Sequence, residues 1–256
     1  MAAADPKSDH ANKLDYMNEN NNFSLKKIDI QEKKNNSNQS DFTLTYFPIG
    51  LATTVGNSLR RILLSLSSGW AIFALKINNI NNEFTTVSGI SNLPTYLILN
   101  LKKLAFQAEE GKQNEVQVCQ ISIDNSQNKN EYQVTGKDIQ GNLKIINPEV
   151  ILTTVSQGAK LEITLYCRYS WGYCSAKEQK NLLPKEENVI FLSSDYCPVK
   201  EVSSNPVPVV ISLDEQKETL VLGITTNGSI SPSRALTESL KIWKNVATFL
   251  LESQKK

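Results

Sequence analysis

The side chains best suited to acid–base, redox or zinc chemistry are few in this chain of 256 residues, which has one histidine and four cysteines. The histidine, His10, lies in the polar stretch MAAADPKSDHANKLDYMNEN, which has too few apolar side chains to pack into a fixed structure. A histidine that orients a nucleophile, transfers protons or binds zinc must be held in place by its neighbours. We therefore expect no histidine-based catalysis.

The four cysteines are scattered along the sequence at positions Cys119, Cys167, Cys174 and Cys197. Six residues separate Cys167 from Cys174, and this spacing fits neither a CxxC zinc site nor a thioredoxin-type redox pair. We interpret the four as buried free thiols of a protein in a reducing compartment. A disulfide between Cys167 and Cys174 is the alternative.

Motifs for phosphate binding, nucleophilic catalysis and paired metal ions are missing. The sequence contains no GxxxxGK[ST] loop, no GxGxxG after a strand, no GxSxG elbow and no DxDxD cluster for magnesium. The carboxylate pairs Glu109–Glu110 and Glu186–Glu187 stand beside lysines in polar segments, which indicates solvated surface. We therefore predict that the chain has no catalytic site of its own.

The aromatic residues of the segment RYSWGY offer one candidate binding surface. Tyr169, Trp171 and Tyr173 lie near Arg168 in the sequence, and aromatic rings beside a cation can stack on nucleobases. Aromatic residues at strand ends more often pack against the rest of the protein, and we prefer that interpretation.

Composition limits the function classes further. The chain is 40% hydrophobic and 21% charged with a net charge of +1, whereas domains that mainly bind phosphate backbones carry a basic excess. No run reaches the roughly 18 apolar residues of a membrane span, and the N-terminus lacks the apolar core of a secretory signal. Asparagine makes up about a tenth of the chain, a bias that points to an organelle or to a bacterium with an A/T-rich genome.

The pattern of apolar residues predicts two strands and a helix near the start. Residues 1–22 are polar and predict a disordered tail, a strand is favoured over 23–30, and the run EKKNNSNQS favours a loop. A second strand is expected over 42–46, where apolar residues alternate with threonines. An amphipathic helix capped by Thr53 or Thr54 should follow and stop at Gly69. Its apolar stripe consists of Val55, Leu59, Ile62, Leu63 and Leu66.

The middle of the chain predicts an antiparallel sheet with one short helix. Residues 71–77 alternate as a strand before a turn at Asn78–Asn79, and a helix is expected over 94–104. A polar, turn-like segment should occupy 171–188. The remaining strand candidates are VQVCQISI, LKII, VILTTV, LEITLYCRY, VPVVISL and TLVLGITT.

The last helix carries the clearest signals, because Ser231 suits the N-cap and Pro232 the first helical position. Its apolar stripe consists of Leu236, Leu240, Trp243, Ala247, Leu250 and Leu251. Both long helices have more apolar surface than one modest sheet would cover, so we predict a helix-mediated dimer, with simple packing on the sheet as the alternative. The residues alone thus indicate an α+β binding or assembly protein in two parts.

Several motifs, in order, resemble those of the bacterial-type RNA polymerase alpha subunit. GNSLRRILLS (residues 56–65) is similar to the family's GNxLRRxLLS helix, and LILNLKKLAF to its LLNLKxL helix. DYCPVKEV is similar to YSPVxxV and TNGSISPSRAL to TNGxIxPxxAL, while GYCSA resembles the end of the family's RGxGYxPA stretch. The segment RYSWGY departs from that glycine-rich stretch. The resemblance covers residues 23–252, and the form that the chain resembles is the N-terminal region of a bacterial-type, plastid-like alpha subunit.

The resemblance implies an α+β fold in two domains. One is a discontinuous dimerisation domain, an antiparallel sheet plus two long helices, over 23–68 and 198–252. The other is an inserted antiparallel α+β domain over 69–197. The two apolar stripes would then form the dimer interface.

The resemblance also implies the partners: a second copy of the chain and the polymerase's beta and beta-prime subunits, with no membrane and little direct DNA contact. The family's arginine pair matches Arg60 and Arg61, with Leu64 one turn on. An internal salt bridge for Arg60 and a solvated position for Lys102 are the alternatives. The residues that match family docking positions are Arg60, Arg61, Leu64, Lys102 and the segment Pro198, Val199, Lys200, Glu201 and Val202.

The implied role is that of a non-catalytic scaffold that binds no cofactor, with magnesium held by beta-prime. A free dimeric regulatory or binding module of the same fold is the alternative. Because the sequence ends at Lys256, we expect the family's C-terminal DNA-binding domain to be absent. The asparagine bias, this shortened end and the divergent glycine-rich stretch favour a plastid (chloroplast) over a bacterial cytoplasm.

Overall fold

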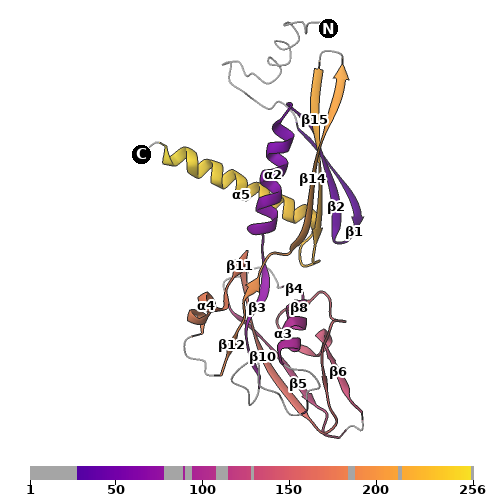
Figure 1. Cartoon of the computed structure of the whole chain (residues 1–256), viewed down its shortest axis with the longest axis vertical. Coiled ribbons are helices and arrows are strands. Elements are labelled where there is room, and N and C mark those ends of the chain that lie inside the picture. The colour runs from indigo at the N-terminus through magenta and orange to yellow at the C-terminus, as the bar shows by residue number, and fades with distance from the viewer. Residues whose placement is uncertain are drawn as a thin grey trace. The chain divides into compact units, whose positions relative to one another are not determined.

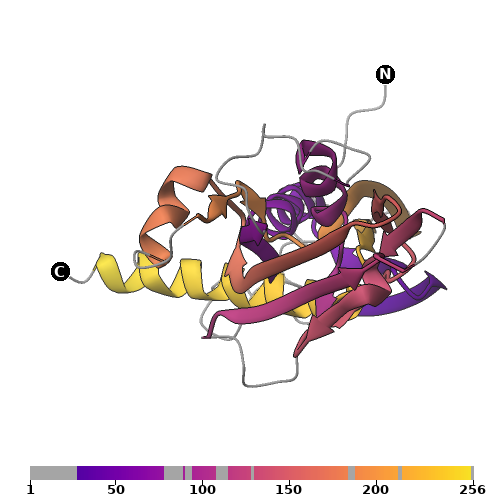
Figure 2. The same cartoon turned by 90° about the horizontal axis from the view of Figure 1, so that it is seen from below.

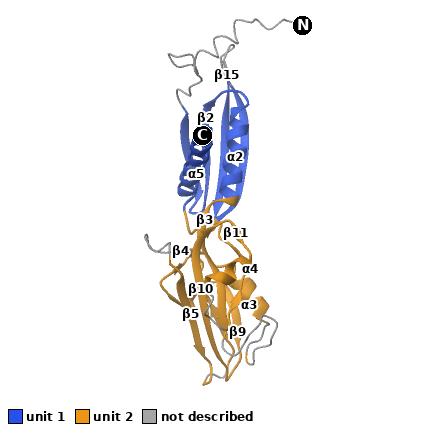
Figure 3. Ribbon diagram, turned by 90° about the vertical axis from the view of Figure 1, so that its left-hand side faces the viewer, with its two compact units in different colours: residues 1–64, 199–226, 231–256 blue, residues 65–198, 227–230 orange. Residues whose placement is uncertain are grey.

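The computed structural model of the chain describes residues 28–77, 89, 94–107, 115–127, 130–183, 188–212 and 215–254. The tail over 1–22 with His10, the turn at Asn78–Asn79 and the two carboxylate pairs lie outside these residues. The chain divides into two compact units (Figure 3), residues 1–64, 199–226 and 231–256 forming unit 1 and residues 65–198 and 227–230 forming unit 2. Both units combine helices with antiparallel sheets, so the predicted α+β class is confirmed.

Unit 1 contains a four-stranded antiparallel sheet in the order β1-β2-β15-β14, together with helices α2 and α5 (Figure 1). The bounds of its elements are β1 Asp29–Asn36, β2 Gln39–Phe47, α2 Leu51–Ser65, β14 Val199–Ser212, β15 Glu215–Thr226 and α5 Pro232–Ser253.

Alternation along the two central strands builds the core of unit 1. Leu44 in β2 lies opposite Leu220 in β15, and Phe42 lies opposite Leu222. All four side chains are buried, because successive residues of a strand point to opposite faces and these share one face. The sheet therefore offers an apolar face on which the helices can pack.

Helix α2 comes unusually close to this sheet at Gly56. A Cβ atom placed there would lie 2.2 Å from Ser204 Oγ and 2.8 Å from Leu220 Cδ1, and both distances are far below van der Waals contact. The absence of a side chain at Gly56 is thus what allows the helix and the sheet to approach this closely.

The start of α2 differs from the predicted one. The helix begins at Leu51, so Thr53 and Thr54 lie inside its first turn instead of capping it. The backbone N–H of Ala52 donates to Glu218 Oε2 at 3.2 Å. A carboxylate from a strand far along the sequence therefore satisfies an amide that a local cap was expected to satisfy. The helix ends at Ser65, and Gly69 lies within β3 rather than at the helix end.

Two segments form strands where the sequence predicted none. The first is polar and was expected to be a loop, and the second contains prolines and was expected to begin later. Most of EKKNNSNQS belongs to β1 and β2, and only Ser37 and Asn38 form the turn. Strand β14 begins at Val199 and runs through Pro206 and Pro208. Because both β1 and β14 are edge strands, exposed polar residues and prolines without an N–H are tolerated there.

Unit 2 is built around a larger antiparallel sheet in the order β7-β5-β10-β3-β4-β8, with β12 pairing beside β3. Two small sheets, β11–β13 and β6–β9, complete its strands. Its strands are β3 Ser68–Ile77, β4 Phe106–Gln107, β5 Gln117–Asp124, β6 Tyr132–Thr135, β7 Ile139–Gly141, β8 Lys144–Ile145, β9 Ile151–Val155, β10 Lys160–Trp171, β11 Tyr173–Cys174, β12 Ile190–Phe191 and β13 Ser194–Asp195. Its helical segments are α3 Pro94–Leu101, η1 Gly136–Asp138, α4 Ala176–Gln179 and η2 Lys180–Leu182.

The core of unit 2 confirms most of the predicted strands and the short helix. Leu97, Leu101 and Leu104 are buried and join the same cluster as Leu75 and Leu165 of the sheet. The segment over 171–188 was expected to be turn-like, but it contains β11, α4 and η2. Ser175 caps α4, since its Oγ accepts from the Glu178 N–H while its own N–H donates to the Glu178 carboxylate at 2.8 Å. This capping box stabilises a helix too short to be recognised by periodicity.

Candidate assembly surfaces

Helix α2 has a buried face and an exposed face with different chemistry. Its buried residues recur at helical spacing, and they are Ala52, Val55, Gly56, Leu59 and Leu63. Arg60, Arg61 and Leu64 lie on the exposed side of the helix, with Leu64 39% exposed. The structure therefore brings three predicted docking residues together on one solvent-facing surface of unit 1. Arg60 forms no ion pair with any residue that the structure describes.

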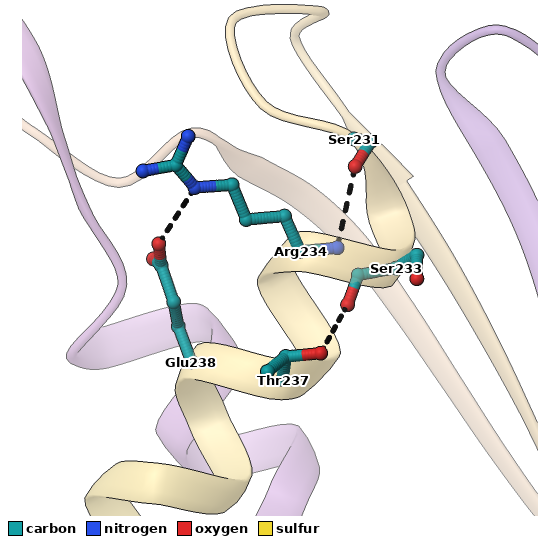
Figure 4. A network of polar contacts seen from close by, with 5 residues as sticks. All are labelled: Ser231, Ser233, Arg234, Thr237 and Glu238. Carbon is teal, nitrogen blue, oxygen red and sulfur yellow. Dashed lines mark hydrogen bonds and ion pairs between the residues drawn. The ribbon is translucent and has the colours of Figure 1, made fainter. Parts of the chain in front are cut away.

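The start of α5 is fixed by local polar contacts (Figure 4). Ser231 Oγ accepts from the Arg234 N–H at 3.3 Å, and Pro232 occupies the first helical position. Arg234 Nε donates to Glu238 Oε1 at 2.9 Å, four residues along the helix. Thr237 Oγ1 donates to the Ser233 carbonyl oxygen at 3.0 Å. These contacts confirm the predicted N-terminus of the helix.

The two halves of α5 differ in burial. The first half packs within unit 1, where Pro232, Ala235, Leu236 and Ser239 are buried. From Lys244 to Ser253 every residue is exposed, and Figures 1 and 2 show this half of α5 running past the sheet of unit 1. The apolar stripe that starts against the sheet therefore continues into solvent.

The exposed half of α5 carries four large apolar side chains. Val246, Phe249, Leu250 and Leu251 are 48%, 70%, 61% and 65% exposed. Leu250 and Leu251 were part of the predicted stripe, whereas Val246 and Phe249 were missed because they lie at the margin of its helical spacing. Contiguous exposed apolar surface of this kind marks interaction sites in soluble proteins.

The residues predicted for the dimer interface divide into three groups. Val55, Leu59, Leu63 and Leu236 are buried within the chain itself. Ile62, Leu240 and Trp243 are half-buried, while Leu66, Ala247 and Leu250 are exposed. The buried group thus packs in the chain's own core, and only the other two groups present side-chain surface that a second copy could contact.

The remaining docking candidates also differ in exposure. Lys102, which follows α3 in unit 2, is exposed. In the segment over 198–202, Lys200 and Glu201 are exposed, whereas Pro198, Val199 and Val202 are buried. The three buried residues therefore hold the segment in place, and Lys200 and Glu201 are the side chains that reach solvent.

The cysteines are all free thiols, so the alternative of a disulfide between Cys167 and Cys174 is wrong. Cys119, Cys167 and Cys197 are buried and Cys174 is half-buried. A hydrogen bond from the Cys167 thiol lowers the pKa of Cys119 to about 7. The same contact, together with burial, raises the pKa of Cys167 well above its usual value. Because both sulfur atoms are shielded from solvent, this shift marks a packing contact within the sheet.

No group of three or more histidine, cysteine, aspartate or glutamate side chains within the described part of the chain could hold a metal ion. None of the helices described there has the length and apolar character needed to cross a bilayer.

The aromatic segment RYSWGY does not pack as a whole. Tyr169 lies opposite Trp70 across the β10–β3 pair, with ring centroids 5.8 Å apart, as the packing interpretation predicted. Trp171 and Tyr173 are 64% and 70% exposed, so for these two residues that interpretation is wrong.

Comparison of the sequence with known proteins identifies the family of the chain. Residues 75–197 match the RNA polymerase Rpb3/RpoA insert domain. The DNA-directed RNA polymerase subunit alpha of Mesoplasma florum is 30% identical over 226 residues, which cover 86% of this chain and 69% of that protein. The same subunit of Oenococcus oeni is 32% identical over 220 residues, covering 85% and 68%. That of Limosilactobacillus reuteri is 31% identical over 223 residues, again covering 85% and 68%. The chain therefore belongs to the family of DNA-directed RNA polymerase alpha subunits.

Proposed function

We propose that the chain is the non-catalytic subunit on which a DNA-directed RNA polymerase assembles: it forms a homodimer and holds the beta and beta-prime subunits. The observation that carries the proposal is the exposed half of α5. Ten consecutive residues, Lys244 to Ser253, are exposed and include four large apolar side chains. Such a surface is stabilised when a second apolar surface removes it from water.

A second copy of the chain is the partner that fits α5. At 1.5 Å per residue, the exposed ten-residue half is about 15 Å long, enough for two such helices to pack side by side. In a twofold dimer each copy contributes the same stripe, so one apolar surface covers the other. The half-buried residues Ile62, Leu240 and Trp243 would border this contact, and Ala247 and Leu250 would lie within it. Residues 23–68 and 198–252 would then act as the dimerisation domain.

The exposed face of α2 is the proposed docking surface for beta. Arg60 and Arg61 offer planar guanidinium groups that can donate paired hydrogen bonds to carboxylates or carbonyls, and Leu64 adds an apolar contact one turn on. Lys102 and Lys200 are further candidates for contact with the large subunits, because both are exposed.

The twofold symmetry of the proposed dimer means that one sequence must dock two different subunits. A twofold dimer presents every surface twice, yet beta and beta-prime are different proteins. One copy of the chain would therefore dock beta and the other beta-prime, using the same sequence. Polymerisation would depend on magnesium bound by beta-prime, while this chain would bind no cofactor, cross no membrane and make little direct DNA contact.

The compartment we favour is the plastid, with a bacterial cytoplasm as the alternative. The asparagine bias of the sequence and its departure from the family's glycine-rich stretch support a plastid, whereas the relatives compared above are bacterial. Mass spectrometry of the native complex would identify the large subunits by sequence and so decide between the two.

Substitution of Arg61 tests the docking proposal. Arg61→Ala should lower the amount of beta that co-purifies with the chain at least about fivefold, because truncated arginines at the centre of an interface commonly cost more than about 1 kcal/mol. The dimer should persist in light scattering. Lys34→Ala, at an exposed position of β1, is the matched control and should leave beta recovery unchanged.

Two results would contradict this assignment. Equal recovery of beta with Arg61→Ala and with the control would exclude the α2 face as the docking surface. A native complex that contains no large polymerase subunit would instead favour a free dimeric regulatory module.

A further inference from the structure

We draw no further inference here: the strongest candidate, the outer face of helix α3 in unit 2, where Tyr96 and Leu99 are 57% and 53% exposed, is an unpartnered apolar face, and nothing in the structure shows what covers it.

Discussion

Helices α2 and α5 have similar amphipathic sequences, but the structure uses their apolar stripes differently. Most of the stripe of α2 is buried in the chain's own core, with Leu59 and Leu63 completely inaccessible to solvent, while Ile62 is half-buried. The stripe of α5 is buried only at its start, and Phe249, Leu250 and Leu251 are exposed. An apolar face in a sequence thus shows that something must cover it, without showing whether the cover is the same chain or a partner.

The largest expected effect is the loss of folding stability when a residue of the buried stripe of α2 is truncated. Leu59→Ala should lower the free energy of unfolding by about 3 kcal/mol, because the substitution removes a fully buried side chain and leaves a cavity. Urea denaturation followed by circular dichroism measures the change. Leu64→Ala, on the exposed face of the same helix, should change it by less than about 0.5 kcal/mol. Equal effects of the two substitutions would contradict the division of α2 into two faces.

A carboxylate in the exposed stripe should act on association instead of folding. Leu250→Asp should raise the dimer's Kd at least about 50-fold, since it would place an unpaired charge in an apolar contact. Light scattering over a concentration series measures this. Asn245→Asp introduces the same group on the opposite side of α5 and should leave the dimer intact.

Substitutions nearer the start of α5 should affect both dimerisation and folding. Leu240 and Trp243 are half-buried, so Leu240→Asp or Trp243→Asp should split the dimer and also destabilise the fold. A Leu250→Asp variant that remained dimeric at micromolar concentration would show that the exposed half of α5 is not the dimer contact.

A smaller effect, with an unusual sign, is expected at the close approach of α2 to the sheet. Replacing a glycine inside a helix by alanine normally stabilises by about 1 kcal/mol. At Gly56 the added Cβ atom would lie 2.8 Å from Leu220 Cδ1, so Gly56→Ala should destabilise by about 2 kcal/mol. Asn57→Ala, at the next, exposed position, should stabilise slightly. Stabilisation by Gly56→Ala in thermal unfolding would show that the helix can move away from the sheet without cost.

Sequence patterns predicted those helix and strand boundaries that are determined by residues close together in the sequence. The N-terminus of α5 was predictable because Ser231 and Pro232 act within one turn of the helix. The start of α2 was not, because the carboxylate of Glu218 that receives its amide lies 166 residues away. Strand β1 was missed for a similar reason: its residues are all exposed, and only pairing with β2 makes them a strand.

The docking candidates show that a motif can select residues without predicting whether their side chains are exposed. Arg60, Arg61 and Leu64 could be selected from one motif, and they share the exposed face of one helix. The segment over 198–202 was selected in the same way, yet Pro198 and Val199 are buried, because exposure depends on tertiary packing that a motif does not encode. Trp171 and Tyr173 were assigned to the interior for lack of any signal that separates a packed aromatic residue from an exposed one.

The smallest expected effect on the free energy of unfolding concerns the Ser231 cap at the start of α5. It again distinguishes folding from association. Ser231→Ala should lower the free energy of unfolding by about 1 kcal/mol, because the Arg234 N–H would lose its acceptor, Ser231 Oγ. Ser233→Ala, two residues further on, removes a hydroxyl that caps nothing and should change stability by only a few tenths of a kcal/mol. Neither substitution should alter the dimer's Kd, because the capped half of α5 packs within its own chain. A Kd that rose with Ser231→Ala would mean that the two halves of the helix are not independent, and that fraying at the packed end reaches the exposed stripe.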